Sequence, residues 1–187
     1  MPKAAFFLLL LAFSSCSLKY DENPSGTDSS PEFEFKDADY KKYEDKKLST
    51  QIQAQLLEQY KDSSAYAKNA RFKTWNSGGD LLTEGYCALL GINSDTKIYT
   101  LFNEIFIDNI EQNFKINAES LKWNSETKQM VSTKDGNVKL TRSDIEIQGS
   151  GFSASGTSKS FEFANPVTGT ITTDDSEESS GEEFSEE

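Results

Sequence analysis

The residue best suited to chemistry in this chain is a cysteine that follows a short apolar run near the N-terminus. Lys3 is followed by ten uncharged, mostly apolar residues, and two serines come directly before Cys16. This order is typical of a secretory signal peptide that ends in a relaxed bacterial lipobox, with Phe13 where leucine is usual. We expect residues 1–15 to be removed and the Cys16 thiol to take a diacylglycerol that holds the protein on a membrane.

Two other readings of this segment stay open. The cysteine could be incidental to an ordinary cleavage site, and the apolar run could be a buried N-terminal helix. The run is much shorter than the roughly 20 apolar residues that cross a bilayer as a helix, so we do not expect a transmembrane segment here.

The remaining residues give little support for catalysis. The chain contains no histidine, which excludes Ser-His-Asp and Cys-His nucleophile systems and histidine metal sites. Cys87 lies in an apolar run and has no partner once Cys16 is lipidated, so we expect a buried thiol without chemistry. No phosphate-binding loop occurs. We therefore expect no enzymatic activity, no cofactor and no metal site.

The charge of the chain is concentrated at its C-terminal end. The formal net charge is −12, and eight acidic residues with no basic residue lie in 174–187. No basic patch is visible, so nucleic-acid binding is not expected. Acidic pairs such as Asp37 with Asp39 are too frequent in this chain to indicate acid–base catalysis. The acidic end also lacks the spaced ligands of a calcium loop.

Composition divides the mature chain into three parts. Residues 16–31 are rich in serine, proline, asparagine and glycine, which is typical of a flexible tether behind the lipidated N-terminus. Residues 172–187 cannot bury apolar surface and are expected to be a disordered acidic tail. The intervening residues 32–171 are enough for one domain.

The pattern within 32–171 predicts β-strands. Between Leu48 and Leu56 apolar and polar residues alternate with a period of two, and the same alternation recurs around Ile116, Leu140 and Ile147. A helix over 46–61 is the alternative, but its early β-branched residues favour a strand. Turn signals separate the runs at 76–80, 93–95, 124–126, 134–137 and 149–151. Short strands at this spacing predict an all-β domain of antiparallel strands.

The order of motifs in this domain resembles the LptC family, the periplasmic component of the lipopolysaccharide-export transporter. The resemblance covers 31–171; its individual motifs are degenerate, and their order and spacing carry the weight. The second half offers Ala118-Glu119, Trp123, Gly136-Asn137-Val138 and Gly149-Ser150-Gly151-Phe152, and the first half offers Phe33, Phe35, Tyr40, Tyr60, Ala70-Arg71-Phe72 and Glu84-Gly85.

The resemblance implies a twisted, incompletely closed jelly roll, folded like a taco, with acyl chains in its apolar interior. Periodicity alone favours a dry packed core, because both interiors give the same pattern, and the resemblance reverses that preference in favour of a lipid groove. The resemblance also implies that unpaired edge strands join neighbouring components. The candidate groove residues are Ile52, Ala54, Phe72, Ile105, Ile107, Phe114, Ile116, Val138, Leu140, Ile145, Ile147, Phe152 and Phe161.

The function that the resemblance implies is lipid transport without catalysis. The protein would accept lipopolysaccharide or another glycolipid from an inner-membrane ABC transporter and pass it toward the outer membrane. Its partners would be the transporter subunits and a periplasmic bridge protein. We expect a periplasmic location with the lipid anchor in the inner membrane; an acylated Cys16 would replace the transmembrane helix of many family members. The rival is a surface-exposed β-rich lipoprotein with an adhesion or structural role, and a secreted hydrolase ranks third.

Overall fold

The computed structural model describes residues 30–173, which form twelve β-strands and, within that range, no helix. The expectations for the signal peptide, Cys16, the tether up to residue 29 and the tail from residue 174 concern residues outside this range. The strands are β1 (Phe33–Glu44), β2 (Lys47–Gln59), β3 (Ser64–Trp75), β4 (Leu81–Asn93), β5 (Ile98–Asn109), β6 (Phe114–Asn124), β7 (Gln129–Ser132), β8 (Asn137–Arg142), β9 (Ile145–Ser150), β10 (Phe152–Ser155), β11 (Ser160–Phe163) and β12 (Thr168–Ile171).

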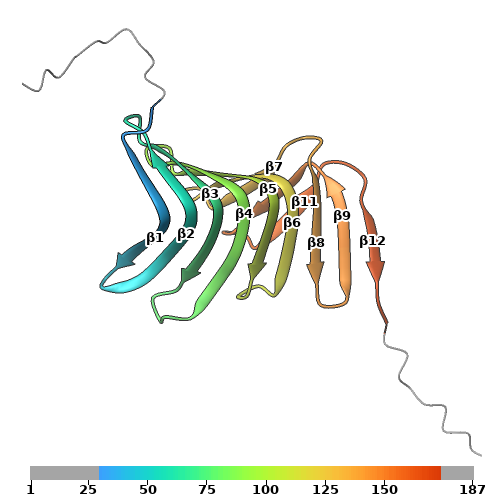
Figure 1. Cartoon of the computed structure of the whole chain (residues 1–187). Helices are drawn as coiled ribbons and strands as arrows, with labels where there is room; N and C mark the ends of the chain where they lie inside the picture. Colours follow the sequence, from blue (N-terminus) through green and yellow to red (C-terminus); the bar gives the residue numbers. More distant parts are fainter. Residues whose placement is uncertain (1–29, 174–187) are drawn as a thin grey trace, which may run out of the picture.

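All twelve strands belong to one antiparallel sheet, which confirms the predicted all-β fold. The alternation between Leu48 and Leu56 lies within β2, so the helical alternative for this segment is wrong. Strands β1 to β6 follow each other as neighbours, and the N-terminal part of β6 then pairs with β8 while its C-terminal part pairs with β7. Figure 1 shows the strands as a row, with β1 at one end and β12 at the other.

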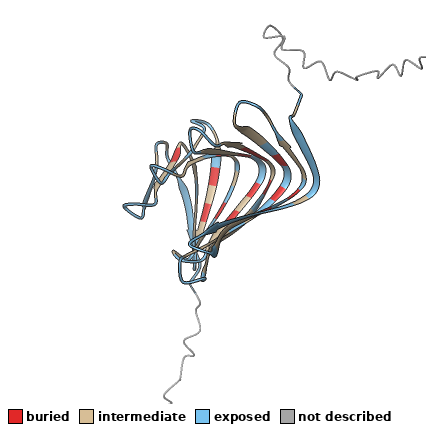
Figure 2. Ribbon diagram, turned by 90° about the vertical axis from the view of Figure 1, so that its left-hand side faces the viewer, coloured by how far each residue is buried: buried red, intermediate tan, exposed pale blue. Residues whose placement is uncertain are grey.

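Each long strand bends near its middle and thereby folds the sheet in two. The later strands repeat this course in pairs, because β7 leads into β8, β9 into β10 and β11 into β12 across the same bend. Figure 2 shows the bent ribbons from the β1 end, with the buried stretches near the bend. The first layer comprises 33–36, 56–59, 64–68, 89–93, 98–102, 120–124, β7, β10 and β11. The second layer comprises 39–44, 47–53, 71–75, 81–86, 105–109, 114–118, β8, β9 and β12.

The bend is built from residues in the left-handed region of backbone conformation. Asp37, Asn69, Asn103 and Glu104 have φ angles of 50°, 50°, 56° and 50°, and Gly151 has 68°. Asn103 and Glu104 lie at a register shift of β5 against both β4 and β6, and such β-bulges kink a strand and raise its twist. At Asp37 and Asn69 the pairing skips residues without a change of register. Asparagine, aspartate and glycine tolerate this conformation better than other residues, so the local sequence supports the bend.

Two of the predicted turns are crossings of the bend. Residues 149–151 were expected to reverse the chain, but Gly149 and Ser150 end β9 and Gly151 leads directly into β10 in the other layer. Residues 134–137 similarly connect β7 to β8 across the bend. The sequence signals are alike because a reversal and a bend both need residues that accept left-handed or unpaired backbone.

The core lies between the two layers, close to the bend. Small buried residues, Ala54, Ala70 and Cys87, lie at the bend itself, while the second layer presents larger residues such as Ile107 and the first layer presents Leu90 and Leu101. Small side chains at the bend let the layers approach each other closely there and reach the packing density of a protein interior. The bend therefore sets the width of the interior.

We predict that Asn69 supports the bend. Asn69→Val should lower the free energy of unfolding by about 1–2 kcal/mol, because a β-branched residue is strained in the left-handed region and because the 2.7 Å hydrogen bond from Asn69 Nδ2 to Gln55 Oε1 is lost. Urea denaturation measures the change. Asn69→Gly should cost less, and Asn117→Val, at an exposed outward site in β6, is the matched control. Equal losses at positions 69 and 117 would contradict this role.

Candidate functional site: the inner face of the bent sheet

The inner face of the second layer carries one continuous row of mainly apolar side chains. The strand register aligns each member of this row with the next, from the β1 edge to the β12 edge. Alternate residues of a strand point to the same face, so the alternation seen in the sequence is what builds the row. The row consists of Tyr40, Ile52, Phe72, Gly85, Ile107, Ile116, Leu140, Ile147 and Gly169.

The thirteen predicted groove residues occupy inward positions of the two layers, but they differ in exposure. Ile145 and Phe161 are exposed near the β12 and β11 edges. Phe72 and Phe114 are half-buried against the core, and Ile147 is half-buried in β9. The other eight are buried: Ile52, Ala54, Ile105, Ile107, Ile116, Val138, Leu140 and Phe152.

The middle of the interior is filled with packed side chains. Phe152, Ile105 and Ile116 are among the largest side chains that are fully buried in the described part. Two hollows open on the surface of residues 30–173, and both are bordered largely by polar side chains. One lies over the outer side of β1 to β3, and the other lies around the β8–β9 turn. Between the central strands the interior is therefore a packed core. An acyl chain fits there only if it displaces these side chains.

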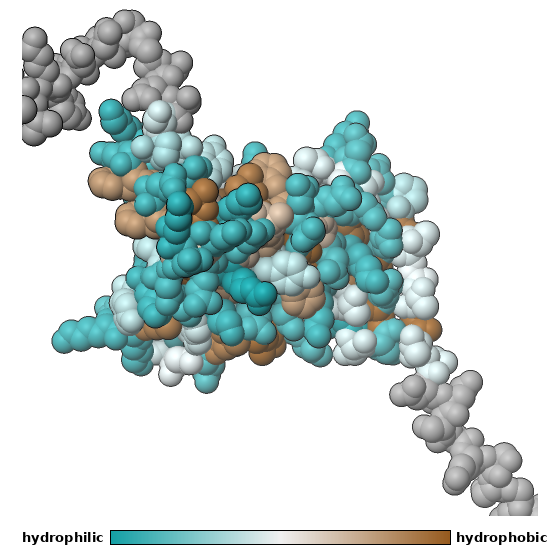
Figure 3. Space-filling view, viewed as in Figure 1, coloured by the Kyte–Doolittle hydropathy of each residue, from teal (hydrophilic) through white to brown (hydrophobic). Residues whose placement is uncertain are grey.

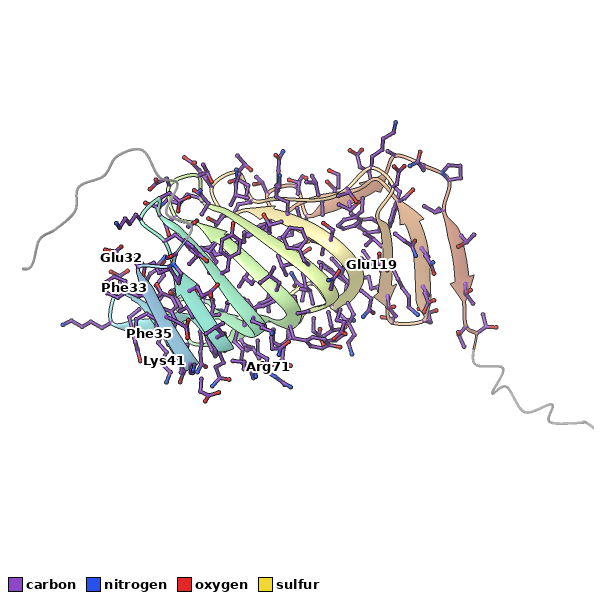
Figure 4. The ribbon with its side chains drawn as sticks, turned by 45° about the horizontal axis from the view of Figure 1, so that its top comes forward. Glu32, Phe33, Phe35, Lys41, Arg71 and Glu119 are labelled. Carbon is purple, nitrogen blue, oxygen red and sulfur yellow. The ribbon has the colours of Figure 1, made fainter. Side chains whose placement is uncertain are left out.

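Inner-face surface that is open to solvent lies at the β1 edge. Phe33, Phe35 and Tyr40 are 51%, 48% and 49% exposed, and the rings of Phe33 and Phe35 stack with their centroids 6.3 Å apart. Figure 4 shows both phenylalanines at the β1 end of the sheet. In Figure 3 apolar side chains also gather near this end, whereas most of the visible outer surface is hydrophilic.

These three aromatic residues are missing from the groove residues predicted from the sequence. The alternation Phe33, Phe35 is interrupted at Asp37, and the inward positions resume at Ala38 and Tyr40 because Asp37 has a left-handed backbone with a φ of 50°. A strict period of two breaks at this point, so the pattern hid them. At the opposite end Ile171 is also exposed, with 66% of its surface accessible.

Gly85 shapes the inner row in the second layer. A Cβ at this position would lie 2.4 Å from the backbone oxygen of Phe106 and 2.6 Å from Cζ of Phe72. The ring of Phe72 thus lies over Gly85 and fills the space that a side chain would take. The glycine is needed here for close packing of an aromatic ring against the sheet.

Basic residues lie at the margins of this site. Arg71 borders the outer hollow at the bend, and its label in Figure 4 marks it on the outer side of the sheet. Lys73 forms an ion pair with Glu84 at 2.9 Å. Arg142 occupies an exposed position at the end of β8. Residues 30–173 contain no cluster of side chains that could hold a metal ion, and no helix in that range is long and apolar enough to cross a membrane.

Within residues 30–173, Cys87 is the one titratable side chain that is buried. Burial raises the pKa of its thiol to about 11, and a hydrogen bond with the backbone of Phe102 opposes this effect. The thiol is 2% exposed and forms no disulfide. A neutral buried thiol is a small apolar side chain without nucleophilic character, as the sequence predicted.

The model of one protein family matches most of this chain, and a relative and a solved structure show further similarity. The model of the family described as "Lipopolysaccharide-assembly, LptC-related" matches residues 4–172. An uncharacterized protein of Treponema pallidum (strain Nichols) is 22% identical over 162 residues, which cover 86% of this chain and 81% of that protein. The fold is similar to that of LptH from Pseudomonas aeruginosa, an LptA-homologous periplasmic component of the lipopolysaccharide transport device. The TM-score is 0.52 at 11% identity, over 66% of this chain and 95% of LptH.

We predict that Cys87 reacts with a thiol reagent only after unfolding. In a Cys16→Ser variant at pH 8, a disulfide reagent such as DTNB should leave the folded protein unlabelled and label it fully in urea. Because the pKa of Cys87 rises from 9.0 to about 11 on folding, its contribution to stability is complete below pH 9 and is lost as the pH approaches 11. Cys87→Ala should remove this pH dependence. Rapid labelling in native buffer would show that the thiol is accessible.

Proposed function

This chain belongs to the LptC-related lipopolysaccharide-assembly family, and we propose that it carries the acyl chains of lipopolysaccharide or another glycolipid on its inner face. Family members are periplasmic transport components rather than enzymes. In this proposal the protein accepts the lipid from an inner-membrane ABC transporter and passes it toward the outer membrane. ATP hydrolysis in the transporter supplies the energy.

The observation that carries the proposal is the half-exposed aromatic surface at the β1 edge. Burial of apolar surface stabilises a complex by about 25 cal/mol per Å². A lipid that covers the exposed side chains of Phe33, Phe35 and Tyr40 therefore gains binding free energy. Acyl chains supply apolar surface of any shape and require no fixed polar partners. In this proposal the packed centre of the sheet stays closed, and the lipid first contacts the inner face of β1.

The unpaired edges of the sheet supply the contacts with neighbouring components. In the described part β1 pairs only with β2, β11 only with β10 and β12 only with β9, so the outer edges of β1, β11 and β12 are free. Free edges accept strands from other proteins by backbone hydrogen bonding. We propose that the transporter side joins β1 and that a periplasmic bridge protein joins β11 and β12, which extends the apolar inner face in both directions.

A lipidated Cys16 fits the same arrangement. The described chain begins next to β1, at the end of the sheet where the inner face is exposed (Figure 1). A tether from residue 16 to residue 30 spans at most roughly 50 Å when fully extended. In our proposal residues 1–15 are the export signal, and the acyl anchor on Cys16 keeps the β1 edge close to the inner membrane.

We predict that lipid contacts can be captured at inward positions of β1. A photoreactive phenylalanine at Phe35 or Tyr40 should crosslink to glycolipid in cells and shift the protein on a gel that is probed for the glycolipid. The same residue at Glu34 or Lys41, which neighbour these positions and point outward, should give at least about tenfold less adduct. The proposal fails if no inward position captures lipid, or if outward positions capture as much.

A further inference from the structure

The open side of the bent sheet is bounded by two rows of turns, which we call the lips. The turns at 45–46, 76–80, 110–113 and 143–144 form the lip of the second layer. The turns at 60–63, 94–97, 125–128 and 156–159 form the lip of the first layer. Any lipid that reaches the inner face from the side has to pass between these lips.

One ion pair connects the two lips. Lys159 Nζ, in the β10–β11 turn of the first layer, lies 3.8 Å from Glu111 Oε1, in the β5–β6 turn of the second layer. The other five ion pairs of residues 30–173 are local. Two join residues of the same strand, and three join neighbouring strands within the second layer. Glu111 and Lys159 are therefore the pair that crosses the opening.

Charged residues at the end of β1, in the second layer, also interact with residues of the first layer. The hydrogen bond to Glu44 raises the pKa of Lys42, and the phenol of Tyr99, in the first layer, adds a smaller effect in the same direction. The hydrogen bond from Lys42 lowers the pKa of Glu44, with a smaller contribution from Lys128, in the lip of the first layer. The end of β1 thus lies near enough to the first layer for electrostatic interaction with Tyr99 and Lys128.

We propose that Glu111 and Lys159 form a latch that holds the lips of the bent sheet together and that its release widens the opening for lipid entry. The first part of this proposal, that the pair holds together two layers that are otherwise connected at the bend, rests on the ion pair alone. The part concerning lipid entry rests on the proposed function.

The ion pair of the latch is weak because both side chains are exposed, and a weak pair allows the lips to open and close. The side chains of Lys159 and Glu111 are 64% and 50% exposed, and exposed pairs of this kind are worth about 0.2–1 kcal/mol. Losing the pair therefore raises the ratio of open to closed lips by at most about fivefold. Salt screens exposed charges, so about 1 M salt should have the same effect as removing the pair.

The test measures the distance between the lips directly. Nitroxide labels on Ile110→Cys and Thr157→Cys, one on each lip and both exposed, report the separation by pulsed electron resonance in the purified full chain. The chain carries Cys16→Ser so that no label attaches at position 16, and Cys87 stays unlabelled because it is buried. Glu111→Gln and Lys159→Gln should each broaden the distribution toward longer distances and raise the open fraction about twofold to fivefold. The charge swap Glu111→Lys with Lys159→Glu should restore the distribution of the original protein.

A second label pair serves as the control. Glu126→Cys with Thr157→Cys places both labels on the lip of the first layer, so its distribution should not change in any variant. The inference is overturned if the single substitutions leave the distance across the lips unchanged, or if the charge swap does not restore it.

Lipid capture tests the second part of the inference. With a photoreactive residue at Tyr40, Glu111→Gln should raise the initial rate of glycolipid crosslinking about twofold to fivefold. Wider lips with an unchanged rate would overturn the role in entry. If no variant captures lipid, the proposed function fails, while the label distances still decide whether the pair holds the lips together.

Discussion

The structure depends on the common bend at which each strand crosses from one layer to the other. A flat antiparallel sheet of this length would expose one apolar face entirely to water, which the hydrophobic effect strongly disfavours. Left-handed residues such as Asp37, Asn69 and Asn103 kink the strands at the bend, and the two halves of each strand then bury each other's inner faces. The sheet thus supplies both sides of its own core.

This construction makes burial uneven along the row of strands. Central strands have neighbours on both sides and a full opposing layer, so Ile116, Val138 and Phe152 are completely buried. The strands at the ends lack this cover, and their inward side chains stay partly exposed. A continuous row of apolar residues therefore includes a rigid packed centre and open ends. For a lipid carrier, the open ends are the accessible part, and partner sheets that join them extend the same surface.

The opening between the lips has a different physical basis from the core. Apolar packing holds the layers together near the bend, where separation would create an empty cavity at a cost of several kcal/mol. Farther from the bend, threonines such as Thr50, Thr74 and Thr83 line the second layer, and one exposed ion pair spans the opening. Motion is therefore expected to be largest at the lips and smallest at the bend, as in a hinged pair of plates.

Local sequence patterns predicted which segments become strands and which side chains point inward. The alternation from Leu48 to Ala54 identified β2 and its inner face, because side-chain direction is a local property of extended backbone. Beyond the bend Leu57, not Leu56, takes the inward position. The same rule placed Ile116, Leu140 and Ile147 on the inner face. The pattern failed where left-handed backbone at the bend changes the period, as between Phe35 and Ala38, and where a bend and a reversal share the same signal, as at Gly151.

The tertiary structure decided what no local pattern contains. Which inward residues are buried and which stay exposed depends on the opposing layer, so Phe161 and Phe152 differ although both face inward. The contact of Glu111 with Lys159 joins two turns that are distant in the sequence, and only the folding of the sheet onto itself brings them together. By itself the sequence determined the strands, most of their inward-facing residues and the family resemblance. The bend determined which inward residues are buried and which ion pair crosses the opening between the lips, because both depend on how distant strands pack.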